Sequence, residues 1–158
     1  MITSDFAAYA VRAAVSLPSS VTPEDVRERL VKLMNAIASE CDRAGSTLIG
    51  HIKCVLDAGE KGFLGVSVTD ASGHATVRGE LGGDLDKLDI IINVLLYGLT
   101  RAQVQGIVEP LTMRCMSFDG GQIELDDLEE RRHHEHGPVP IDIGSLDRHV
   151  HDAGNDHC

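Results

Sequence analysis

Residues 48–81, LIGHIKCVLDAGEKGFLGVSVTDASGHATVRGEL, decide the fold class of this chain. Three short segments of this stretch alternate apolar and polar residues at a period of two, which is typical of half-buried β-strands. Glycine-containing turns at residues 57–62 and 70–73 separate the segments. The stretch therefore predicts an antiparallel meander with one aliphatic face, which packs on helices, and one polar face. We expect the polar face to carry His51, Lys53, Ser67, His74, Thr76, Arg78 and Glu80.

A helix is predicted immediately before the meander. Thr22 is a suitable N-cap, Pro23 fits the first helical position, and Gly45 is a natural stop. Apolar residues recur at helical spacing and define one buried stripe, made of Val26, Leu30, Leu33, Met34, Ile37, Ala38 and Cys41.

Two further helices are predicted at residues 5–16 and 84–99. The first is rich in alanine and follows Ser4, which fits an N-cap. The second is apolar almost all round, which is typical of a helix buried by its domain or by a partner subunit.

A fourth helix and a fourth strand are expected after residue 99. Thr100 and Gln103 fit a capping box that begins a short helix, and Pro110 should end it. Residues 111–118 then fit an edge strand. Together these elements predict an α+β fold with a small antiparallel three- to four-stranded sheet packed on helices. We expect residues 1–120 to form this body and residues 121–158 to form a His-rich, acidic C-terminal tail.

The charge of the chain is concentrated in this predicted tail. The 158 residues include 25 acidic and 14 basic side chains, a net charge of −11. Residues 121–158 carry −7 of this charge together with six of the eight histidines. The acidity argues against a nucleic-acid partner, because phosphate binding depends on Lys and Arg. No apolar run is long enough to span a membrane, and the first residues lack a signal-peptide pattern, so we expect a cytoplasmic protein.

The tail predicts a metal site. Imidazole and thiolate are preferred ligands of zinc, nickel and cobalt. Histidines two residues apart point the same way in an extended segment. His134 with His136, and His149 with His151, can therefore each offer two nitrogens towards one side. The candidate ligands are His133, His134, His136, His149, His151, His157 and Cys158. Because protons compete for the same lone pairs, binding should weaken on mild acidification.

The tail resembles the His-rich C-terminal tails of nickel and zinc accessory proteins. The resemblance covers residues 133–158 and rests on composition rather than on a motif. It implies a non-catalytic, chaperone-like accessory protein whose body docks on a protein target while the tail binds a divalent transition metal ion, zinc or nickel.

Two alternative functions remain open. The chain fits a small structural or assembly subunit, or a homo-oligomer, whose tail wraps a protein partner. It also fits a metal-dependent enzyme that uses His51 and His74 on the polar face of the sheet, although no nucleophile–base spacing supports catalysis.

Overall fold

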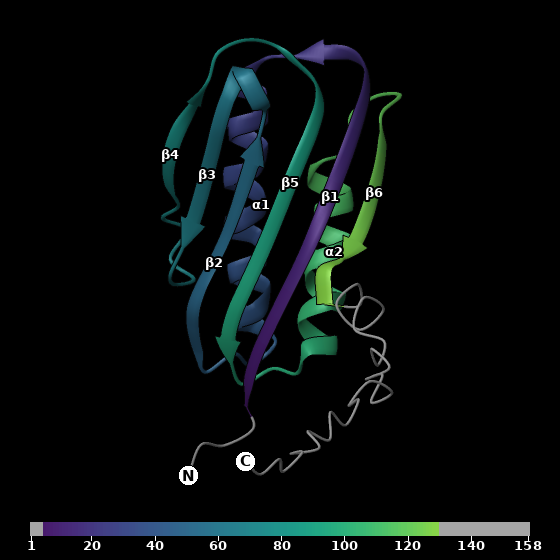
Figure 1. The fold of residues 1–158 in the computed structure, drawn as a ribbon. Helices are drawn as coiled ribbons and strands as arrows, with labels where there is room; N and C mark the ends of the chain where they lie inside the picture. The colour runs from purple at the N-terminus through teal and green to yellow at the C-terminus, as the bar shows by residue number, and fades with distance from the viewer. Residues whose placement is uncertain (1–4, 130–158) are drawn as a thin grey trace, which may run out of the picture.

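A computed structural model describes residues 5–129, which form one antiparallel sheet covered on one face by two helices (Figure 1). In chain order the elements are β1 (Phe6–Val21), α1 (Pro23–Arg43), β2 (Leu48–Asp57), a 3-10 turn (Gly59–Lys61), β3 (Gly62–Val68), β4 (Thr76–Leu81), β5 (Leu85–Tyr97), α2 (Arg101–Cys115) and β6 (Gln122–Asp127). The six strands lie in the order β4-β3-β2-β5-β1-β6. The α+β class is therefore confirmed, but the predicted sheet of three to four strands is too small.

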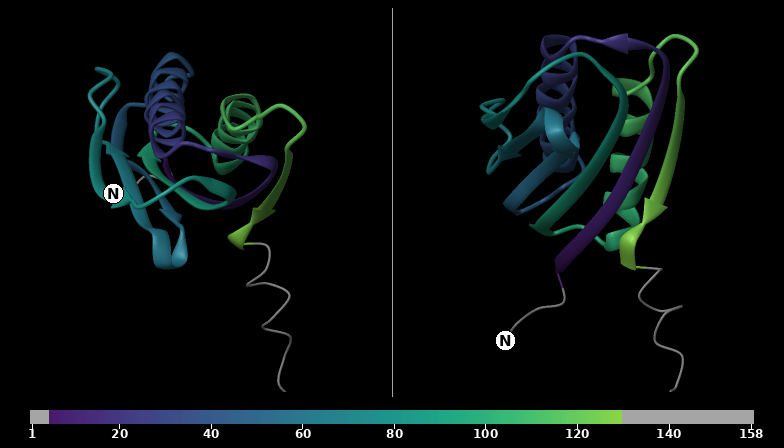
Figure 2. Two further views of the ribbon diagram at one scale, coloured as in Figure 1. Left: turned by 90° about the horizontal axis from the view of Figure 1, so that it is seen from above. Right: turned by 45° about the horizontal axis from the view of Figure 1, so that its top comes forward.

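Both helices lie on the same side of the sheet, as the view from above shows (Figure 2). α1 contacts β2, β3 and α2, whereas α2 packs on β1. The core fills the space between the helices and the sheet, and the opposite face of the sheet carries no helix of the described residues. Among residues 5–129, neither helix combines the length and hydropathy needed to traverse a lipid bilayer.

The helix predicted before the meander is confirmed as α1. The side-chain oxygen of Thr22 accepts a hydrogen bond from the backbone N–H of Asp25 at 3.2 Å, and Pro23 occupies the first turn. The seven residues of the predicted apolar stripe are the buried residues of this helix. Helical periodicity was decisive here because one face alone contacts the sheet and α2.

The predicted meander is also confirmed, as β2, β3 and β4. Cys54 pairs with Val66, and Val66 pairs with Val77, so these strands are consecutive neighbours. The β2 and β3 side chains on the helix side are buried, among them Ile52, Leu56 and Leu64.

The predicted helix over residues 5–16 is wrong, because these residues belong to β1. Ala7, Tyr9, Val11, Ala13 and Val15 alternate as buried side chains of this strand. Alanine favours helices, but pairing with β5 on one side and β6 on the other outweighs this local preference.

The predicted helix over residues 84–99 is wrong as well, because most of it is β5. This strand pairs with β1 and β2 in the middle of the sheet. A central strand is apolar on its core side, and β5 also carries Ile91 and Leu95 on its other side. An apolar segment of this kind matches both a buried helix and a buried strand, and its β-branched residues favour the strand.

The region after residue 99 begins as predicted and then differs. The capping box is present, with Thr100 accepting from the Gln103 backbone and Gln103 accepting from the Thr100 backbone. However, α2 continues through Pro110 to Cys115, so most of residues 111–118, the expected edge strand, is helical. Burial of Val108 and Thr112 against the core holds this last part of the helix in place.

The edge strand beside β1 is β6 instead. It lies C-terminal to the boundary expected after residue 120, so the sheet includes residues assigned to the tail. The division of the chain into a body and a tail otherwise stays a prediction.

Substitution of neighbouring isoleucines in β5 tests the strand assignment. Ile92 is fully buried, whereas Ile91 faces away from the core. We expect Ile92→Ala to lower the free energy of unfolding by about 3 kcal/mol, because it leaves a cavity in the core. Ile91→Ala should cost less than about 1 kcal/mol. Urea unfolding of dilute protein measures both, and equal losses would contradict the alternation of the strand.

Candidate functional site

The helix-free face of the sheet, which we call the open face, is defined by cross-strand rows of outward side chains. One row runs from β4 to β6 through Arg78, Gly65, Val55, Ile91, Arg12 and Asp126. The next row runs through Glu80, Phe63, Asp57, Asp89, Ala14 and Glu124. At the far end of the sheet, Leu48, Tyr97 and Phe6 form a shorter row.

Large apolar side chains gather on the open face. Six such side chains of residues 5–129 are 39–59% exposed, and they are Phe6, Leu48, Phe63, Ile91, Tyr97 and Met113. All except Met113, which belongs to α2, lie in the rows of the open face. Exposed apolar groups collected on one face are typical of an interaction surface.

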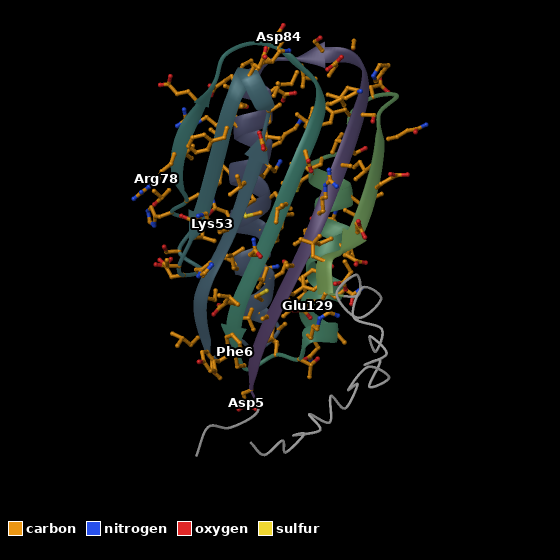
Figure 3. All side chains as sticks on the ribbon, in the orientation of Figure 1. Asp5, Phe6, Lys53, Arg78, Asp84 and Glu129 are labelled. Carbon is orange, nitrogen blue, oxygen red and sulfur yellow. The ribbon has the colours of Figure 1, made fainter. Side chains whose placement is uncertain are left out.

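The aromatic end of the open face is formed by residues from three strands. The rings of Phe6 and Tyr97 contact each other with centroids 5.2 Å apart and planes tilted by 54°. Leu48 pairs with Tyr97 from the other side. Phe6 lies at the lower end of the sheet in Figure 3. These side chains form an apolar patch across β1, β5 and β2.

A shallow hollow of about 350 Å³ lies on the β2–β4 half of the open face. Lys53, Phe63 and Arg78 line it together with the hydroxyl-bearing Ser67 and Thr76. Both cations are labelled on this half in Figure 3. Within residues 5–129, neither cation makes a side-chain hydrogen bond or ion pair. This half of the face is therefore bulky, and it carries these two cations beside the carboxylates of Asp57 and Glu80.

Glycine allows Phe63 to lie across β4. Gly79 has a φ of +87°, and a Cβ atom there would come within 2.9 Å of the Phe63 ring. A larger residue would strain the backbone and displace the ring. The bulk of Phe63 on this half therefore depends on Gly79.

The β1 half of the open face is smaller and more acidic. Apart from Phe6 at one end and Arg12 near the middle, the outward side chains of β1 are small, and they include Ala8, Ala10 and Ala14. The Arg12 guanidinium donates to both carboxylate oxygens of Asp89 at 2.7 and 2.8 Å, and these hydrogen bonds hold the pKa of Asp89 below its usual value. Beyond β1, strand β6 adds the carboxylates of two residues, Glu124 and Asp126.

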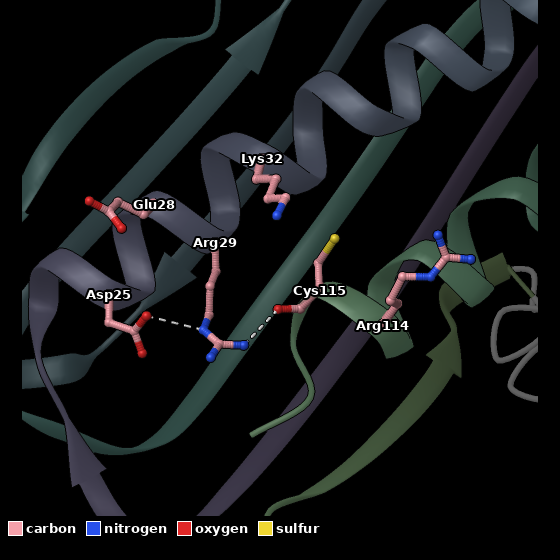
Figure 4. Close-up of a pocket in the computed structure, with 6 residues that line it drawn as sticks. All are labelled: Asp25, Glu28, Arg29, Lys32, Arg114 and Cys115. Carbon is pink, nitrogen blue, oxygen red and sulfur yellow. Dashed lines mark hydrogen bonds and ion pairs between the residues drawn. The ribbon is translucent and has the colours of Figure 1, made fainter. Parts of the chain in front are cut away.

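A second hollow, of about 370 Å³, lies between α1 and the end of α2 on the helical side (Figure 4). Arg29 spans it by donating to the backbone oxygens of Cys115 and Ser117 at 3.2 and 2.8 Å. Its guanidinium also lies 4.1 Å from the centroid of the Phe118 ring. Arg29 thus joins the two helices.

Cys115 lines the same hollow, with Lys32 and Arg114 nearby. Burial raises the pKa of its thiol, and the positive charges of Lys32, Arg114 and Arg29 only partly oppose this effect. The thiol therefore stays protonated at neutral pH, which does not favour a nucleophilic role.

A polar network joins β1, α2 and β6. The Tyr9 hydroxyl donates to Glu109 at 2.9 Å, and burial raises the pKa of Tyr9. Arg101 donates to the Asp127 carboxylate at 2.5 and 2.6 Å and to Glu129 at 2.7 Å. The Asp127 side chain is 7% exposed, so its carboxylate is largely withdrawn from water, whereas the Arg101 side chain is 34% exposed. The network fastens β6 to α2.

The structure places only part of the sequence-predicted site. His51 lies on β2 in the open face, and His74 lies in the turn before β4, where its Nδ1 is 2.9 Å from the Ser72 hydroxyl oxygen. The predicted metal ligands lie outside the described residues: His133, His134, His136, His149, His151, His157 and Cys158. Among residues 5–129, no group of three His, Cys, Asp or Glu side chains is arranged to hold a metal ion.

Sequence reasoning missed the aromatic end of the open face. Phe6 and Tyr97 belong to segments whose composition predicts helices, so their shared row was not anticipated. Reading residues 85–97 at a period of two would have placed Ile91, Leu95 and Tyr97 on one face.

Comparison with known proteins identifies no relative: no family model, curated protein or solved structure matches the chain. The geometry of residues 5–129 and the sequence of the remainder are therefore the guides to its function.

Removal of Arg101 tests the network that holds β6. Arg101→Gln removes the guanidinium that donates to the buried Asp127 carboxylate, and we expect a loss of about 2 kcal/mol in unfolding free energy, after allowing for the partial exposure of Arg101. The matched control is Arg43→Gln, which removes an exposed pair with Glu40 and should cost less than about 0.5 kcal/mol. Urea unfolding compares the variants, and equal effects would show that the network does not hold β6.

Proposed function

We propose that this chain is a protein-interaction module whose docking surface is the open face of the sheet. The observation that carries this proposal is the position of five of the six exposed large apolar side chains on that face. Exposure of these groups to water opposes solubility, and a protein partner that covers them removes the cost. Of the functions expected from the sequence, the assembly subunit fits this geometry best.

The composition of the open face agrees with this role. Interfaces are enriched in aromatic residues and arginine, and the open face offers Phe6, Phe63 and Tyr97 together with Arg78. It rests on a sheet whose other side is a continuous buried core, so the surface is already formed before binding. A rigid surface loses less conformational entropy when a partner binds.

Photo-crosslinking in cells tests the docking surface. We would place a benzophenone amino acid at Lys53, on the open face, or at Arg27, an exposed residue of α1. We expect the full-length chain to form a discrete adduct from position 53 and none from position 27. Adding Ile91→Asp should abolish the adduct, because a buried charge in the interface opposes association. Diffuse labelling that ignores both position and Ile91 would overturn the proposal.

Metal binding through residues 133–158 remains a second candidate function. It is supported by six histidines and a cysteine within these 26 residues, in an acidic background that attracts cations. The two functions are compatible, because the proposed ligands and the open face belong to different parts of the chain. In such a protein the module would dock on a target and present or store zinc or nickel.

Calorimetric titration of Zn²⁺ into the full-length chain tests this candidate. We expect binding at pH 7.5 and at least about tenfold weaker affinity at pH 5.5, because free imidazole titrates near pH 6.5. Replacing the six histidines of residues 133–157 by Gln should abolish binding, whereas His51→Gln with His74→Gln should not. Truncation after residue 120 is unsuitable, because it removes β6. Zn²⁺ binding that survives the six replacements would contradict the tail site.

A further inference from the structure

The two halves of the open face differ in size and charge in a complementary way. On the β2–β4 half, Phe63 and Val55 project from the sheet, and the positive charges of Lys53 and Arg78 balance the carboxylates of Asp57 and Glu80. On the β5–β6 half, β1 presents alanines and β6 presents the carboxylates of Glu124 and Asp126. When a second copy is rotated by 180° and placed against this surface, each half meets the opposite half of the other copy.

We propose that the partner on the open face is a second copy of this chain, related by a two-fold axis that runs parallel to the strands between β2 and β5. This inference rests on the proposed docking function and names its occupant. Two identical faces pack against each other only when the two-fold axis lies in the plane between them. With the axis along the strands, β4 lies over β6 of the second copy, β3 over its β1, and β2 over its β5.

This arrangement brings apolar side chains together in each of the two rows that cross all six strands. Val55 meets Ile91 of the second copy, and the bulky Phe63 meets the small Ala14. Large side chains opposite small ones allow two sheets to interdigitate at the spacing of a packed sandwich. Each contact occurs twice because of the symmetry.

Charges at the two edges of the sheet also meet in this arrangement. Arg78 on β4 comes opposite Asp126 on β6 of the second copy, because both belong to one row. In the next row Glu80 comes opposite Glu124, which is a like pair, but Arg78 is only two residues, about 7 Å, from Glu80 along the strand. In the centre, Asp57 would approach Asp89, whose charge is already neutralised by Arg12. Arg78 therefore supplies the electrostatic attraction at the edges of the interface, whereas packing at its centre depends on the complementary sizes of the side chains.

The alternative axis, perpendicular to the strands, places each strand on its own counterpart. The carboxylates of Glu124 and Asp126 on β6 would then approach those on β6 of the second copy, and the alanines of β1 would face other alanines. Like charges repel, and small side chains facing each other leave voids. The axis parallel to the strands is therefore favoured.

The open face is large enough for a dimer. Six strands spaced about 4.8 Å apart span about 24 Å, and nine residues of a long strand span about 30 Å. The resulting area is roughly 700 Å² on each copy, close to the ~800 Å² per partner of a standard interface.

Exchanging a large and a small side chain between two variants tests the symmetry directly. We would prepare full-length Phe63→Ala and Ala14→Phe variants and measure their dimerisation by analytical ultracentrifugation. Each variant alone should dimerise at least about tenfold more weakly than the unaltered chain. In a Phe63→Ala dimer, alanine faces alanine at both symmetry-related contacts, which leaves voids. In an Ala14→Phe dimer, phenylalanine faces phenylalanine at both contacts, which prevents close packing. The variants exchange side-chain size rather than the charges of Arg78 and Asp126. Arg12 of the same chain also interacts electrostatically with Asp126, so a charge exchange would alter two interactions at once.

An equimolar mixture of the two variants should restore dimerisation. In the mixed dimer, the alanine introduced at position 63 of one copy faces the phenylalanine introduced at position 14 of the other, and the second contact keeps the original Phe63 and Ala14. Met113→Ala is the matched control, because it removes an exposed apolar side chain of α2 and should dimerise like the unaltered chain. Circular dichroism and thermal unfolding check that every variant is folded.

Each outcome of the experiment is decisive. Restoration in the mixture supports the two-fold arrangement. A monomeric unaltered chain, a dimer insensitive to both replacements, or a mixture that stays dissociated would overturn it. The crosslink from position 53 separates this inference from the docking function: a discrete adduct of a mass other than twice that of the chain keeps the docking surface and rejects the second copy.

Discussion

The pairing of β5 with β1 on one side and β2 on the other is the interaction on which the structure depends. It joins the N-terminal strand to the meander and completes a sheet of six strands. Because both helices pack on the same side, the core-facing residues of β5, such as Ile90 and Ile92, are fully buried. The outward residues of the same strand are left on the open face. One central strand thus supplies both the core of the fold and the middle of the proposed interface.

Local signals in the sequence predicted the elements whose neighbours are close in the chain. Thr22 and the apolar stripe identified α1, and glycine turns identified the meander from β2 to β4. β1 and β5 were misassigned because their partners lie far away in sequence and override the alanine content of one and the continuous hydrophobicity of the other. The open face could not be anticipated, since it required both strands to be placed correctly.

The polar groups of the described residues divide by role. Arg29 and Arg101 contact backbone oxygens or buried carboxylates, so these arginines hold elements together. Lys53 and Arg78 have no such partner within residues 5–129 and face outward beside Phe63. The sequence predicted that Lys53 and Arg78 lie on a polar face of the sheet. It did not distinguish cations that join elements of the fold from cations that are exposed to a binding partner. That distinction needs the contacts of each guanidinium and ammonium group.

The strand order also constrains how the chain folds during its synthesis. β1 is made first, yet both of its neighbours in the sheet, β5 and β6, are made last. At a translation rate of roughly 5–20 residues per second, the ~90 residues between Phe6 and its partner Tyr97 take on the order of 5–20 s to emerge. Throughout that interval the apolar residues of β1 have no strand to pair with. The ribosome-bound chain therefore exposes a long apolar segment for several seconds, a condition that favours aggregation until β5 and β6 are made.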